Sequence, residues 1–144
     1  MADESTAKGL LPVVDWLKLP EGGEPYLEAH KCQACGAFYL GERSNCSKCF
    51  ARGRMKPVRL ANRGTLYAYS IVHRSFPGIE TPYVSAIVDL EGGGTVKGNL
   101  IGIDPDPEKI RMGMPVEVVY KDALGRKDRE GRSYISYFFQ PRAD

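Results

Sequence analysis

Two pairs of cysteines constrain this chain more than any other feature of its sequence. The pairs are CQAC at 32–35 and CSKC at 46–49, and the 144 residues contain no other cysteine. A CxxC turn places two sulfurs on one side of a tight loop, and two such loops facing each other form a tetrahedral four-sulfur metal site. The predicted ligands are Cys32, Cys35, Cys46 and Cys49. Because the protein would supply all four ligands, the metal would be structural and not catalytic.

Four cysteines in this pattern have three alternatives to a structural zinc site. Disulfides are disfavoured because the chain has the character of a cytosolic protein. A thioredoxin-like redox centre requires one CxxC pair at the start of a helix, and two pairs with a short spacer do not fit that pattern. Iron bound by four sulfurs in the same geometry stays open. We therefore expect structural zinc, with iron as the alternative.

The ends and composition of the chain suggest a cytoplasmic protein. Hydrophobic residues make up 42% of the sequence and charged residues 26%, as in ordinary globular proteins. No uninterrupted apolar run approaches the roughly 20 residues that span a bilayer. The sequence opens with acidic MADE, whereas a secretory signal opens with basic residues. We expect cytoplasmic localisation without membrane association.

The second half of the chain is predicted to form strands. Five β-branched and aromatic runs are separated by turn residues, which is typical of a small closed barrel of the OB type. The runs are Thr65–His73, Tyr83–Leu90, Thr95–Ile103, Val116–Lys121 and Ser133–Gln140. The charged segment Asp122–Arg132 is predicted to be a mobile loop. The expected fold is therefore mostly β, with an N-terminal segment at 1–25, a rubredoxin-like zinc ribbon at 26–60 and a five-stranded OB-fold barrel at 61–144.

Positive charge is concentrated around the cysteines. Residues 31–64 carry eight lysines and arginines and one acid, Glu42, although the whole chain has a net charge of only +2. Such a segment favours an anionic ligand, namely a phosphate, a nucleic acid or an acidic partner. OB-folds that bind single strands stack bases on aromatic residues of strands 2 and 3. Here these strands offer only Tyr83 and Lys97. Nucleic-acid binding is therefore the second choice.

The sequence provides no recognisable catalytic constellation. All cysteines are assigned to the metal, and the common nucleophile and phosphate-binding motifs are absent. A stand-alone CoA-thioester enzyme would have to depend on His73, which lies at the end of the first barrel strand. We expect no catalytic residues in this chain acting alone.

Taken together, residues Tyr26 to Pro141 resemble the zinc-ribbon/OB-fold acyl-CoA-associated family, known as a domain of unknown function. The matching segments are LEAHKCQACG at 27–36, the second cysteine pair, GTLY at 64–67, PYV at 82–84, GMPV at 113–116 and the closing aromatic strand. Unlike its relatives, this chain has no proline inside either CxxC pair and has a short N-terminal region.

The resemblance implies an accessory subunit of a thiolase-fold or lipid-transfer-type enzyme. In this family the partner holds the catalytic groups, and the small subunit shapes the acyl-CoA site in reactions that include retro-aldol cleavage of sterol side-chain CoA thioesters. The residues expected near acyl-CoA are Arg59, Arg63, His73, Phe76 and Pro77. The residues expected at the partner interface are the strand-5 aromatics Tyr134, Tyr137, Phe138 and Phe139.

Overall fold

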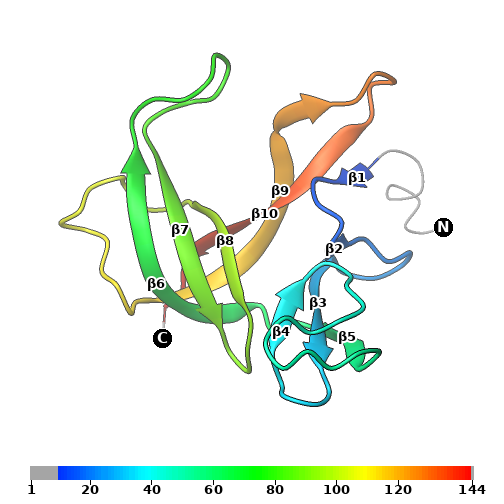
Figure 1. The fold of residues 1–144 in the computed structure, drawn as a ribbon. Coiled ribbons are helices and arrows are strands. Elements are labelled where there is room, and N and C mark those ends of the chain that lie inside the picture. Colours follow the sequence, from blue (N-terminus) through cyan, green and yellow to red (C-terminus); the bar gives the residue numbers. More distant parts are fainter. Residues whose placement is uncertain (1–9, 144) are drawn as a thin grey trace. The chain divides into compact units, whose positions relative to one another are not determined.

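The computed structural model describes residues 10–143, which form strands and turns without a helix (Figure 1). This all-β architecture confirms the predicted fold class. The strands are β1 Leu10–Pro12, β2 Leu17–Lys18, β3 Tyr26–Cys32, β4 Phe38–Leu40, β5 Met55–Arg59, β6 Arg63–Val72, β7 Tyr83–Leu90, β8 Thr95–Leu100, β9 Pro115–Lys127 and β10 Ser133–Pro141. No helix capable of crossing a membrane occurs in residues 10–143.

The chain divides into two compact units. The first contains the chain up to Leu60 together with Tyr120–Ser136, and the second contains Ala61–Val119 and the C-terminal residues from Tyr137. The chain thus passes from one unit to the other between Leu60 and Ala61. Residues 1–9 of the predicted N-terminal segment lie outside the described residues. The three-part division of the chain stays a prediction.

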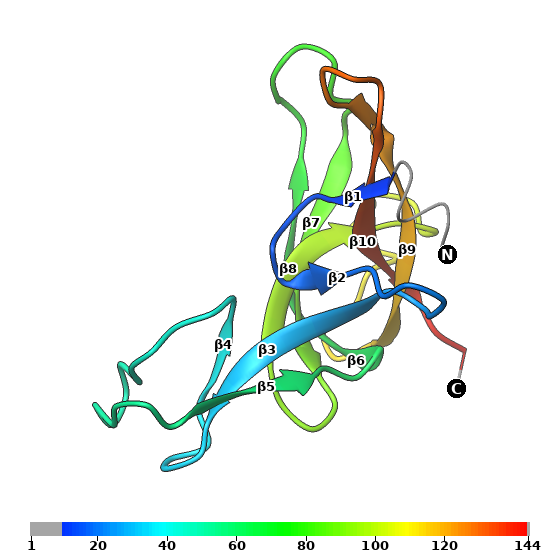
Figure 2. The same ribbon diagram turned by 90° about the vertical axis from the view of Figure 1, so that its right-hand side faces the viewer.

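The first unit is organised around β3, which is the centre of a small antiparallel sheet (Figure 2). β4 pairs with one edge of β3 and β5 with the other, and β2 pairs with the beginning of β3. Alternate side chains of β3 point into the unit because successive residues of a strand face opposite sides. Leu27 and Ala29 of β3 are consequently fully buried, as is Leu17 of β2.

Strands β6, β7, β8, β10 and β9 form the closed five-stranded barrel, an OB-fold. β6 pairs with β7 and β7 with β8 in antiparallel register, β8 pairs with β10, and β9 closes the ring by pairing with both β10 and β6. β7 shows the alternation that builds such a core, because every second side chain from Val84 to Val88 is buried. The predicted strand Tyr83–Leu90 coincides with β7.

A glycine at the start of β6 permits the close approach of two neighbouring strands. Gly64 pairs with Leu90 of β7 on one side and Val116 of β9 on the other. A Cβ atom at this position would lie 2.2 Å from the backbone oxygen of Asp89, so no other residue fits without moving the strand. A register shift between Leu66 and Ala68 follows it and bends β6 further.

One segment that the sequence predicts to be a loop is in part a strand. The prediction of a mobile loop at Asp122–Arg132 is wrong for its first half, because β9 continues to Lys127. The side chains of this extension are mostly exposed, so no hydrophobic alternation marks it in the sequence. No element is predicted from the sequence at β5. This strand contains Pro57 and pairs with β3 as an edge strand, the position in a sheet that tolerates proline.

Candidate metal centre

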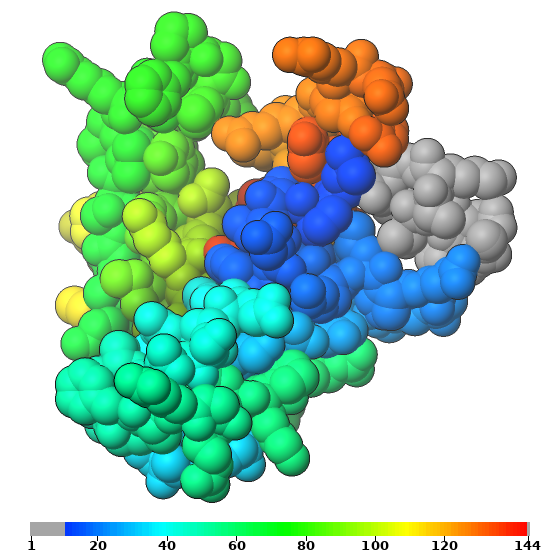
Figure 3. Space-filling model, turned by 45° about the vertical axis from the view of Figure 1, so that its right-hand side comes forward, coloured from blue at the N-terminus to red at the C-terminus, as the bar shows by residue number. Residues whose placement is uncertain are grey.

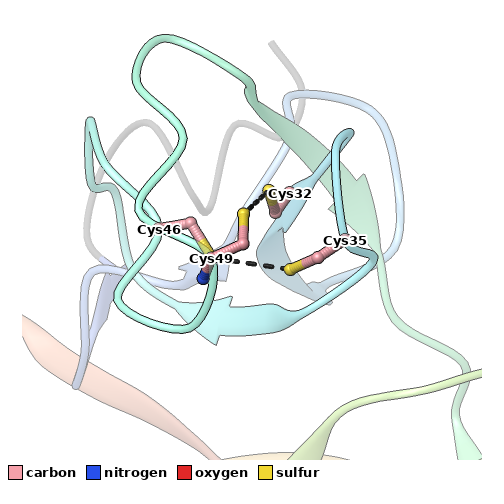
Figure 4. Close-up of side chains that lie close together, drawn as sticks. All are labelled: Cys32, Cys35, Cys46 and Cys49. Carbon is pink, nitrogen blue, oxygen red and sulfur yellow. Dashed lines mark hydrogen bonds between the residues drawn. The ribbon is translucent and has the colours of Figure 1, made fainter.

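The four cysteines come together from two turns of the first unit (Figure 4). Cys32 ends β3 and Cys35 lies in the turn before β4, while the second pair lies between β4 and β5. The sulfurs of Cys32 and Cys49 are 3.7 Å apart, those of Cys35 and Cys46 are 3.6 Å apart, and all four lie within 4.8 Å of one another. Tetrahedral zinc with bonds of about 2.3 Å requires sulfurs about 3.8 Å apart, whereas a disulfide bond is about 2.05 Å. The geometry and the donor set therefore fit one four-coordinate ion.

Hydrogen bonds prepare Cys46 to act as a thiolate ligand. The Tyr39 hydroxyl lies 3.5 Å from its sulfur, and the backbone N–H groups of Lys48 and Cys49 donate to the same atom at 3.3 and 3.4 Å. The tyrosine contact and then the backbone donors lower the pKa of Cys46 to about 5, against the opposing effect of burial. A thiolate at neutral pH is the form that binds a metal.

The surroundings of Cys32 favour its thiolate form, whereas those of Cys49 disfavour it. The backbone N–H of Cys35 is the main cause that lowers the pKa of Cys32. At Cys49 the backbone N–H of Ala51 favours the thiolate, but partial loss of water around the sulfur and the neighbouring sulfurs together raise its pKa to about 11. Four thiolates without a cation repel one another, and a bound divalent cation removes that repulsion.

We call the two cysteine turns the first knuckle (32–37) and the second knuckle (46–51). They share the same pattern of backbone hydrogen bonds. In each, the N–H of the fifth residue donates to the carbonyl of the first, from Gly36 at 2.8 Å and from Phe50 at 2.9 Å. In each, the N–H of the first residue donates to the carbonyl of the sixth, at 2.8 and 3.0 Å. The two knuckles are thus local repeats that present their sulfurs in equivalent ways.

Tyr39 connects a guanidinium to the second knuckle. Arg43 stacks on the ring of Tyr39 at 4.1 Å from the ring centre, and the hydroxyl of that ring contacts both Cys46 and Ser47. Cys32 and Cys46 are buried, whereas Cys35 and Cys49 are exposed. One side of the candidate metal site therefore faces the surface.

The residues predicted to lie near acyl-CoA do not form one cluster within either unit. Arg59 belongs to the first unit and stacks on Tyr26 at 3.9 Å. Arg63 begins β6 and pairs with Glu91 at 3.6 Å, whereas His73 follows the other end of the same ten-residue strand. Phe76 and Pro77 lie with His73 in the exposed loop between β6 and β7. About 30 Å of extended chain separates the two ends of β6.

The predicted interface aromatics on β10 divide into two groups. Phe138 and Phe139 are buried in this chain, with exposures of 6% and 0%. Tyr134 and Tyr137 are half-buried, and the Tyr137 hydroxyl donates to the backbone oxygen of Lys97. Of these four residues, Tyr134 and Tyr137 are therefore the two with exposed surface that a partner can contact.

The structure also contains a cavity that the sequence analysis did not anticipate. It has a volume of about 730 Å³ and lies in the first unit beside β3, where Trp16, His30 and Glu42 are among its lining residues. The Nδ1 atom of His30 is buried there and has no hydrogen-bond partner among the described residues. Its lining residues come from four separate stretches of chain, so no single motif could reveal it.

Fold and site together define a class of protein, in which a small four-cysteine ribbon unit precedes an OB-fold barrel. A protein-family model of the ChsH2 C-terminal OB-fold domain matches residues 57–121. A DUF35 domain-containing scaffold protein of Methanocaldococcus jannaschii is 34% identical over 113 residues, which cover 77% of this chain and 78% of that protein. The chain belongs to the DUF35 family.

Two further relatives are named as parts of a thiolase and of an aldolase. Benzoylsuccinyl-CoA thiolase subunit BbsA of Geobacter metallireducens is 35% identical over 129 residues, covering 88% of this chain and 82% of that subunit. The solved structure of the Ltp2-ChsH2(DUF35) aldolase matches with a TM-score of 0.61 and 31% identity, over 81% of this chain and 84% of the matched chain. These matches confirm the family resemblance drawn from the sequence.

Proposed function

We propose that this chain is a non-catalytic accessory subunit that binds a thiolase-fold, lipid-transfer-type partner and helps to shape its acyl-CoA site. The observation that carries the proposal is the match, over most of both chains, to a subunit named for a thiolase and to the chain of an aldolase structure. The family resemblance drawn from the sequence implies the same role. A finer form of the proposal is that the complex cleaves a sterol side-chain CoA thioester by a retro-aldol reaction.

In that reaction the partner supplies the chemistry. A base removes the proton of the β-hydroxyl group, the bond between the α and β carbons breaks, and its electron pair forms an enolate stabilised by the thioester. Protonation of the enolate completes the release of acyl-CoA and a carbonyl product. This chain would contribute contacts from Arg59, Arg63, His73, Phe76 and Pro77 along the CoA channel, and from Tyr134 and Tyr137 at the interface.

The four-cysteine centre is proposed to hold zinc, which would stabilise a ribbon too small to maintain its own core. Metal analysis of freshly isolated protein should find one zinc per chain, and a strong chelator should lower the thermal stability of the first unit. Iron in the same site would give a coloured protein with one iron per chain. Protein that contains neither metal, or that has equal stability with and without the chelator, would contradict a structural ion.

Co-purification tests the accessory role. The tagged full chain is expressed in its native host and the captured proteins are identified by mass spectrometry, with a tagged unrelated OB-fold protein as control. We expect a thiolase-fold subunit in fixed stoichiometry with this chain, and a stable complex on size-exclusion chromatography. Absence of any thiolase-fold protein from the captured material would contradict the proposal.

A second candidate function is binding of single-stranded nucleic acid, which the net charge of +7 over residues 31–64 favours. A labelled oligonucleotide should then bind at low salt, and its affinity should fall steeply as salt is raised. If no binding occurs at low salt, this alternative is removed.

A further inference from the structure

The fifth residue of each knuckle has a left-handed backbone, but the two knuckles place different residues there. Gly36 in the first knuckle has φ of +83°, and Phe50 in the second has φ of +65°. Glycine adopts this conformation readily because it lacks a Cβ atom, whereas a bulky side chain makes it unfavourable. The first knuckle thus shows the residue that the turn prefers, and the second knuckle departs from it.

Packing within the chain does not compensate for this departure. The Phe50 side chain is 78% exposed, although a phenyl ring gains most of its stabilising energy by burial. The Phe50 side chain makes the left-handed backbone unfavourable and leaves apolar surface in water. It therefore makes no evident contribution to the stability of the fold. Backbone conformations of this kind are concentrated at functional positions.

The surroundings of Phe50 are strongly basic and held in place by hydrogen bonds. No acidic residue occurs between Glu42 and Glu80. Lys48, Arg52 and Arg54 are exposed near Phe50 in the sequence. The two arms of the turn are joined by a bridge between Asn45 and Arg52 and by the N–H of Gly53, which donates to the Ser44 carbonyl at 3.1 Å. The atoms of this segment, coloured cyan to green, lie at the surface of the first unit (Figure 3).

We propose that Phe50 is an anchor that inserts into an apolar pocket, rimmed by carboxylates, on the thiolase-fold partner. This inference rests on the proposed function and assigns a docking residue to it. Aromatic residues and arginines contribute most of the binding energy of protein interfaces when the partner buries them. Basic side chains around an exposed ring are complementary to an acidic rim, which increases the association rate and fixes the orientation.

An exposed ring on a turn favours a protein over a nucleotide as the occupant. Small-molecule sites are concave and enclose most of their ligand. Phe50 instead projects from the turn and requires the pocket to be on the other molecule. A single-stranded nucleic acid would also need successive aromatic residues on which to stack its bases. The test must therefore distinguish a protein partner from a nucleic acid.

The decisive variant is Phe50→Gly, which places in the second knuckle the residue that the first one has. Affinity for the co-purified thiolase-fold subunit is measured by titration calorimetry with metal-loaded full chain. We expect Phe50→Gly to weaken binding about tenfold or more. The thermal midpoint of the isolated chain should stay the same or rise, because the left-handed turn no longer carries a side chain. Phe50→Asn, which tolerates the same backbone, should behave in the same way.

Leu124 in β9 provides a matched control, because it is also a non-glycine residue with a left-handed backbone (φ of +56°) and its side chain is 69% exposed. Leu124→Gly should change the affinity much less than Phe50→Gly if the effect is specific to the second knuckle. The double variant Arg52→Gln/Arg54→Gln should slow association and reduce its salt dependence.

Three outcomes would overturn the inference. In the first, the complex forms but Phe50→Gly and Phe50→Asn bind the partner as tightly as the wild type does. In the second, both variants lower the thermal midpoint of the isolated chain. In the third, both weaken oligonucleotide binding while partner binding is unaffected. The first outcome leaves the proposed function intact and removes only the role of Phe50. If no thiolase-fold subunit binds even the wild-type chain, the proposed function fails and the inference fails with it.

Discussion

At the scale of single residues, each sulfur of the candidate metal centre has a distinct environment. Cys32 and Cys46 are buried at the first position of each knuckle. The pKa of Cys32 is lowered mainly by the backbone N–H of Cys35, and that of Cys46 mainly by the Tyr39 hydroxyl and then by backbone N–H groups. Cys35 and Cys49 are exposed and lie at the fourth position. A metal ion would link the two knuckles, so the loss of one buried ligand should release both turns.

Replacement of Cys32 by serine should therefore unfold residues 32–49 while the barrel persists. Hydrogen exchange followed by mass spectrometry measures this directly, because the amides of the knuckles should lose protection and those of β7 should keep it. Ser44→Ala, an exposed change in the same turn, serves as control. Equal protection of the knuckles in Cys32→Ser and wild-type protein would show that the sulfur has no structural role.

Gly64 supports a second prediction at this scale. Its replacement by alanine forces a Cβ atom against the backbone oxygen of Asp89 in a pair of strands that cannot separate without disrupting the barrel. We expect a loss of about 3 kcal/mol or more in the free energy of unfolding, at the upper end of the range for overpacking. Urea denaturation measures it, with Ser70→Ala on the same strand as control. A change within experimental error would show that β6 and β7 are less closely paired than described.

At the scale of elements, the loop between β9 and β10 is closed by one carboxylate. Asp128 accepts hydrogen bonds from the backbone N–H groups of Glu130 and Arg132 at 3.0 and 2.8 Å and from Arg132 Nε at 2.6 Å. Burial opposes ionisation, but the hydrogen bonds from Arg132 and Glu130 outweigh it and lower the pKa of Asp128 below that of a free carboxyl group. The ionised form therefore adds to the backbone hydrogen bond from Asp128 to Arg132 that also closes the loop.

The pH dependence of this loop follows from the direction of that shift. A carboxyl group with a lowered pKa in the folded state stabilises it fully above its unfolded pKa, and the contribution is lost as pH falls through the folded value. Amide protection in residues 128–132 should thus be constant above about pH 5 and decrease below about pH 4. Asp128→Ala should remove the dependence, while Arg129→Ala should retain it. Unchanged protection down to pH 2 would contradict this account.

Hydrophobic patterns predicted the elements that have one buried face. The alternation in β7 and in the first half of β9 is visible in the sequence because one face of each strand lines the barrel. The second half of β9 has mostly exposed side chains, and β5 contains Pro57, a residue that is uncommon inside strands. Both strands form because a partner strand supplies hydrogen bonds, which no local pattern records.

At the scale of the whole molecule, cysteine spacing was sufficient to predict the four-sulfur cluster, because two CxxC turns restrict the sulfurs so strongly. The unusual backbone of Phe50 was not predictable, since it becomes visible only when the two knuckles are compared in space. The burial of Phe138 and Phe139 was equally hidden, because an aromatic run has the same sequence in a core and at an interface.

We propose that this chain is a metal-supported scaffold and that the reactive groups belong to another polypeptide. The most direct test of this proposal is acyl-CoA turnover by the co-purified thiolase-fold subunit alone, by this chain alone, and by the two together. We predict that this chain alone gives no turnover and that the mixture exceeds the partner alone by at least an order of magnitude. Turnover by the isolated chain that disappears in His73→Ala would contradict it.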